Sequence, residues 1–85
     1  MEIGLLWFDN DPKSTLEDKI RRAAGRYAQK FGRPATVCFL NPAALAGRPA
    51  PDDSFEVALA DGTVKVFARR QVQPHHFWVG VPIAQ

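Results

Sequence analysis

STLEDKIRRAAGRYAQKFGRP, residues 14–34, is the stretch that decides the fold. Apolar side chains recur in it at steps of three and four, which gathers them into one stripe along a helix: Leu16, Ile20, Ala23, Ala24, Tyr27, Ala28 and Phe31. Ser14 and Glu17 have the spacing of a capping box. Gly32 is placed to end the helix, and Pro34 prevents its continuation. We therefore predict an amphipathic helix over about Thr15–Phe31.

Apolar runs of strand length lie on both sides of this helix. Ile3–Phe8 is continuously apolar, which predicts a strand that is covered on both faces and central in its sheet. Ala35–Leu40 is a second such run, and the order strand, helix, strand predicts two parallel strands joined by a right-handed crossover. Asn41 and Pro42 are suited to open one short helical turn that runs through Leu45.

The C-terminal half of the chain predicts β structure. Residues 47–53 carry two prolines and a glycine and are expected to form a loop. Phe55–Leu59 and Thr63–Phe67 flank Asp61-Gly62, which is a good signal for a β-hairpin. His76–Val81 is a last, aromatic strand. The sequence thus predicts an α+β two-layer sandwich, with one amphipathic helix packed on a mixed four- to five-stranded sheet, in the order β-α-β-β-β-β.

Length and composition are those of an ordinary globular domain. The chain has 85 residues, enough for a single domain over 1–85; 46% are hydrophobic, 24% are charged, and the net charge is +2. So small a positive excess does not by itself indicate a nucleic-acid-binding protein. No basic segment precedes an apolar stretch at the N-terminus, and charges or prolines interrupt every hydrophobic run. We therefore expect no signal peptide, no membrane span and a cytoplasmic location.

The sequence contains no recognisable catalytic or cofactor-binding motif. Cys38, the only cysteine, lies in an apolar run and is expected to be buried and inert. Ser14 and Ser54 lack a glycine elbow and a base partner, and the six glycines are scattered rather than gathered in a phosphate-binding loop. We expect no cofactor and favour a binding role over an enzymatic one.

An acidic loop, Asp9-Asn10-Asp11, follows the first predicted strand. If the first and last strands are neighbours, Asp9, Asp11 and His76 resemble the ligands of a metal-dependent hydrolase. The alternative is that both carboxylates end the strand and start the helix by bonding nearby backbone groups. His75 and His76 should point to opposite faces of an extended segment, so we do not expect them to bind one ion together.

Basic residues gather on the predicted helix, where six cationic side chains stand against two acidic ones between Ser14 and Arg33. Such a face either grips phosphates without reading base sequence or is simply solvated. The candidate nucleic-acid contacts are Arg21, Arg22, Arg26 and Lys30.

The aromatic side chains of the predicted strands are expected mostly to pack in the core: Trp7, Phe8, Phe77 and Trp78. Trp78, however, lies in a terminal strand that we expect to be an open edge of the sheet, and open edges pair with other chains. We therefore predict that Trp78 and His76 contact a protein partner or a second copy of the chain.

The segments GLLWFDNDP (4–12) and HFWVGV (76–81) resemble those of short uncharacterised prokaryotic proteins. The end of the helix, Lys30–Arg33, and the stretch Cys38–Leu45 are also similar, so the resemblance covers most of the chain. It implies a bacterial origin and brings no activity, cofactor or site residue with it.

Three hypotheses about function follow, in this order. The first is a small non-enzymatic interaction module that binds a protein partner, or itself as a homodimer, through a sheet edge. The second is a nucleic-acid-binding accessory protein that uses the basic helix face. The third is the metal-dependent hydrolase.

Overall fold

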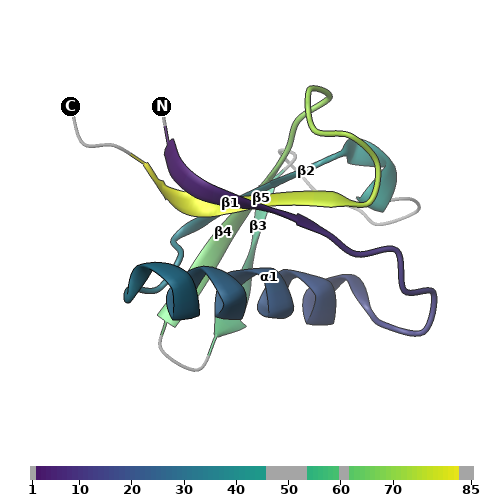
Figure 1. The fold of residues 1–85 in the computed structure, drawn as a ribbon. Coiled ribbons are helices and arrows are strands. Elements are labelled where there is room, and N and C mark those ends of the chain that lie inside the picture. Colours follow the sequence, from purple (N-terminus) through teal and green to yellow (C-terminus); the bar gives the residue numbers. More distant parts are fainter. Residues whose placement is uncertain (1, 46–53, 60–61, 83–85) are drawn as a thin grey trace.

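Five strands form one mixed sheet, and an α-helix covers one of its faces (Figure 1). The computed structural model describes residues 2–45, 54–59 and 62–82. Along the chain, the elements are β1 (Glu2–Phe8), α1 (Leu16–Phe31), β2 (Val37–Leu40), the 3-10 turn η1 (Pro42–Leu45), β3 (Ser54–Leu59), β4 (Gly62–Ala68) and β5 (His76–Pro82). The predicted α+β class, its two layers and its order of elements are confirmed.

Helix α1 begins with a different cap from the one expected. The Oγ1 of Thr15 accepts a hydrogen bond from the N–H of Asp18 at 3.1 Å. The prediction of Ser14 as the cap is wrong, because its hydroxyl donates instead to Asp11 at 2.8 Å. Gly32 ends the helix with a φ of 73°, a left-handed conformation that glycine adopts without steric cost. Within the described residues, no helix has the length and apolarity needed to cross a bilayer.

The strands lie in the order β1-β5-β2-β4-β3. Strand β5 is antiparallel to both β1 and β2, β4 is parallel to β2, and β3 is antiparallel to β4. Strands β1 and β2 therefore run parallel, as expected, but β5 lies between them. Two predictions are wrong: β1 is an outer strand, not a central one, and β5, which carries Trp78, is an inner strand, not an edge. Strand order depends on contacts between distant segments, which the apolarity of one run does not encode.

The hairpin prediction is confirmed by the antiparallel pairing of β3 with β4, in which Leu59 lies opposite Gly62. The predicted loop 47–53 and the turn residue Asp61 lie outside the described residues. The predicted turn after β2 is also confirmed, because the Oδ1 of Asn41 accepts from the N–H of Ala43 at 2.8 Å at the start of η1.

The core lies between α1 and the sheet. It is built from side chains that alternate along the strands and from one stripe of the helix: Ile20, Ala23, Ala24, Tyr27, Cys38, Leu40, Val57, Val64, Val66, Phe77 and Val79. Burial raises the pKa of the Cys38 thiol to about 12, so the prediction of a buried, inert cysteine is confirmed. Successive side chains of a strand point to opposite faces of the sheet. The strand residues that alternate with these core residues therefore lie on the face that α1 does not cover.

Candidate interaction surface

Apolar and aromatic side chains lie on the face of the sheet opposite α1. This open face, as we call it, comprises Leu6 and Phe8 of β1, His76 and Trp78 of β5, Phe39 of β2 and Phe67 of β4. Strand pairing places Leu6 opposite Trp78 and Phe8 opposite His76. Phe39 lies between Trp78 on one side and Phe67 on the other. Four neighbouring strands thus contribute to one largely apolar surface.

The two halves of the open face differ in how far they are covered. On β2 and β4, the rings of Phe39 and Phe67 stack with their centroids 5.6 Å apart, and the Arg69 guanidinium lies 5.3 and 5.2 Å from the two centroids. On β1, by contrast, Leu6 and Phe8 are 54% and 55% exposed. Exposed large apolar side chains that lie together mark an interaction surface. The half formed by β1 and β5 is therefore the candidate site.

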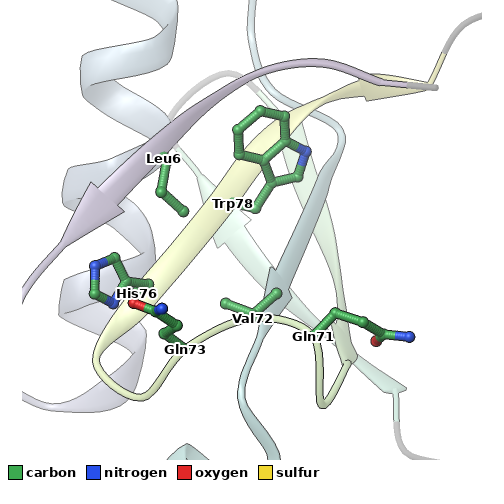
Figure 2. Close-up of a pocket in the computed structure, with 6 residues that line it drawn as sticks. All are labelled: Leu6, Gln71, Val72, Gln73, His76 and Trp78. Carbon is green, nitrogen blue, oxygen red and sulfur yellow. The ribbon is translucent and has the colours of Figure 1, made fainter.

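A hollow of about 400 Å³ lies on this half of the open face (Figure 2). Three of its lining residues come from the strands and three from the loop between β4 and β5: Leu6, His76 and Trp78, and Gln71, Val72 and Gln73. The Nδ2 of Asn41 donates to the carbonyl of Val72 at 2.8 Å and so holds this loop in place. An apolar hollow with an amide rim is suited to receive an apolar side chain.

His76 and Trp78, the predicted partner contacts, both line this hollow although β5 is not an edge. The Nδ1 of His76 lies 2.9 Å from the carbonyl of Pro74. Because a carbonyl only accepts, this nitrogen carries the proton, and in the neutral ring Nε2 stays free to accept. The Trp78 indole lies over Gly4, where a Cβ would come within 3.0 Å of the ring and 2.6 Å of the Val79 carbonyl. Glycine at this position lets the indole lie against β1.

Leu6 and Phe8 are the site residues that sequence reasoning missed. The continuous apolarity of Ile3–Phe8 predicts burial on both faces, whereas these two side chains of β1 are exposed. The Phe8 ring contacts the His76 ring at a centroid distance of 5.1 Å and the His75 ring at 6.4 Å. No local signal distinguishes them, because their exposure follows from the position of β1 in the strand order.

Among the residues that the structure describes, strand β1 also presents unpaired backbone at its outer edge. The N–H of Asp9 donates to the carbonyl of His75 at 2.9 Å, so the backbone of Asp9 faces β5. In an antiparallel pair, the backbone N–H and C=O groups of successive residues point alternately toward the partner strand and away from it. Because those of Asp9 point toward β5, those of Phe8, Leu6 and Gly4 point away from it. Among the described residues, no hydrogen bond to these outward groups is found.

The opposite edge of the sheet, β3, is protected. The Nε of Arg21 donates to the carbonyl of Ala58 at 3.1 Å, and the same guanidinium pairs with Asp18 at 3.3 Å. Glu56 adds a charge to β3, opposite Lys65 of β4. Charged and covered edge strands resist pairing with another chain. Of the two outer strands, β1 is therefore the one open to a partner.

The acidic loop after β1 forms an ion-paired connection to α1. Asp9 is buried and accepts hydrogen bonds from Arg22 Nη1 and from the N–H of Asp11, both at 3.1 Å. Burial raises the pKa of Asp9, but these hydrogen bonds outweigh it, so its pKa lies below the ordinary value. Hydrogen bonds from the N–H of Lys13 and the hydroxyl of Ser14 lower the pKa of Asp11. These contacts fit the interpretation in which the two carboxylates end the strand and start the helix, and not the one in which they bind a metal ion.

The three predicted metal ligands are not brought together. Arg22 lies 3.1 Å from Asp9 and 3.8 Å from Asp11, and His76 lies on the open face. His75 instead lines a cavity of about 200 Å³ with Asp9. It lies in a turn with a φ of 65°, so the extended segment on which the expectation for the two histidines rested is not present. In the part of the chain that the structure describes, no group of three or more His, Cys, Asp or Glu residues is placed to hold a metal ion.

The predicted nucleic-acid contacts on α1 are exposed, but most have partners within the chain. Arg21 and Arg22 form the ion pairs given above. Arg26 donates to Gln29 Oε1 at 3.2 Å, and the Lys30 ammonium lies 5.7 Å from a neighbouring aromatic ring. The two ion pairs neutralise part of the basic face, and its binding to nucleic acid stays a prediction.

Comparison with known proteins adds no functional assignment. The chain matches no family model, no curated protein and no solved structure. Its resemblance to short prokaryotic proteins stays a prediction, and its function has to be argued from the candidate site itself.

Proposed function

We propose that this chain is a small non-enzymatic interaction module that binds another polypeptide through strand β1 and the adjoining half of the open face. One observation carries the proposal: β1 is an outer strand, and its Leu6 and Phe8 side chains are more than half exposed. An extended segment added at such an edge gains main-chain hydrogen bonds, and side-chain pockets beside the edge give selectivity. The hollow lined by Trp78 and His76 supplies such a pocket.

The test is capture of partners from the native host by the tagged chain, with low-salt, high-salt and nuclease-treated washes. The variant Leu6→Asp/Phe8→Asp places two charges on the exposed positions of β1. Its matched control, Ala58→Asp/Thr63→Asp, places the same two charges on exposed positions at the opposite side of the sheet.

We expect the unmodified chain and the control to retain a polypeptide, whether a second copy or another protein, through all three washes. The β1 variant should lose it. Retention that the β1 charges do not alter contradicts the proposal. Recovery of nucleic acid that disappears in high salt favours the alternative through Arg21, Arg22, Arg26 and Lys30, because phosphate contacts weaken steeply with salt.

A further inference from the structure

We infer that the polypeptide which β1 binds is a second copy of this chain, with the two β1 strands paired antiparallel about Leu5. The inference rests on the proposed function and adds the identity of the partner and the register. The direction of the backbone groups, the side chains that would meet and the distribution of charge along β1 support it.

The hydrogen-bonding pattern of β1 suits pairing with itself. Its outward backbone groups belong to the even-numbered residues, because Asp9 bonds to β5 and the pairs alternate. When two copies of Glu2–Phe8 overlap along their full length, Leu5 lies on the two-fold axis and Gly4 lies opposite Leu6 of the second copy. Even-numbered residues then face even-numbered residues, so outward donors meet outward acceptors along the whole strand.

The side chains that meet in this register are complementary. Leu6 of each copy lies beside Gly4 of the other, which has no side chain and which the Trp78 indole covers. The exposed leucine thus gains an aromatic neighbour from the second copy. Because the axis is perpendicular to the sheet, both helices lie on one side, and the two open faces join into one surface. Because a two-fold contact uses the same surface of both copies, assembly through this edge stops at two chains.

Charge also favours a second copy over a charged partner. Glu2 is the one charged residue of β1. In this register it lies opposite Phe8 of the second copy, so no two like charges lie directly opposite each other in the paired segment. The cations that lie against the rings of the open face, Lys65 and Arg69, are on or after β4, at the other side of the sheet. An edge strand that is apolar along most of its length is the kind that pairs with its own copy.

The first test measures hydrogen exchange in the unmodified, purified chain by NMR at a series of protein concentrations. We expect the exchange rates of the outward amides of Gly4, Leu6 and Phe8 to fall by a factor of roughly ten or more as the dimer forms. The amides of Glu56 and Ala58 on β3 should not respond, and they serve as the internal control. Sedimentation velocity should give a dimer for the unmodified chain and for Ala58→Asp/Thr63→Asp, and a monomer for Leu6→Asp/Phe8→Asp.

The second test determines the register by cross-linking. Leu5→Cys places two thiols on the two-fold axis, within the distance that a disulfide spans, and mild oxidation should convert most of the chain to covalent dimer. Leu6→Cys should cross-link only weakly. The native Cys38 does not compete, because it is buried and its pKa is raised to about 12. If Leu5→Cys does not fold, the exchange experiment on the unmodified chain still decides whether β1 forms the dimer interface.

Three results would overturn the inference. A chain that sediments as a monomer at all concentrations, while capture from the host still retains another protein through β1, rejects the second copy and leaves the proposed function standing. A dimer that survives Leu6→Asp/Phe8→Asp places the interface elsewhere. Efficient cross-linking of Leu6→Cys but not Leu5→Cys rejects the register.

Discussion

The two edges of this sheet are held to the same helix by adjacent arginines, and they differ in what is left uncovered. Arg21 reaches the outward carbonyl of Ala58, the last residue but one of β3. Arg22 instead reaches Asp9, one residue beyond the end of β1. The first contact covers backbone that another chain would otherwise bind, whereas the second anchors the end of β1 and leaves its outer side open. Anchoring a strand and protecting its edge are therefore separate tasks.

The largest effect is expected where β1 joins the sheet. Gly4→Ala should lower the free energy of unfolding by about 3 kcal/mol, because the added Cβ meets the Val79 carbonyl and the Trp78 ring, and close packing resists such insertion. The measurement is urea denaturation followed by circular dichroism.

Gly25→Ala is the matched control for this substitution. Gly25 is exposed on α1, and a Cβ there meets nothing within 4 Å. The same change should therefore stabilise the chain by about 0.5–1 kcal/mol. Equal effects at both glycines would show that β1 is not held as closely against β5 as the structure has it.

The anchor of β1 should depend on pH. The pKa of Asp9 is lowered in the folded chain, so its contribution to stability is present above the unfolded pKa of about 3.9 and is lost as the pH falls through the folded pKa. Asp9→Asn should cost about 1–2 kcal/mol at neutral pH. It should also flatten the loss of stability below about pH 5. Unfolding free energies measured across this range test both effects, and an unchanged acid profile in the variant would contradict the role of Asp9.

The smallest effect on stability is expected at the protected edge. Arg21→Ala removes an exposed ion pair and one hydrogen bond, so it should cost less than about 1 kcal/mol. It also uncovers the outer backbone of β3, which should increase concentration-dependent association, measured by light scattering. Arg26→Ala, which lies on the same helix and contacts Gln29 rather than a strand, is the control. If both variants associate equally, the Arg21 contact does not protect the edge.

Much of the fold follows from the sequence because its signals are local. The helix limits follow from a stripe of period 3.6 and from Gly32, and the hairpin from Asp61-Gly62 between alternating runs. At the helix, the identity of the cap was mistaken, because Ser14 and Thr15 are adjacent and both are suited to cap a helix. Two residues that line the hollow, His76 and Trp78, were predicted from the sequence as partner contacts, although the reason given for Trp78, an edge position, was wrong.

The sequence by itself determined the elements, the amphipathic face of α1 and the burial of Cys38, because each depends on residues within a few positions along the chain. Only the tertiary structure decided that β5 lies between β1 and β2, and hence that Leu6 and Phe8 are exposed at an open edge. It likewise decided which arginine protects an edge, through a hydrogen bond between residues 37 positions apart. Strand order and edge protection arise from contacts between distant segments, and no local pattern carries that information.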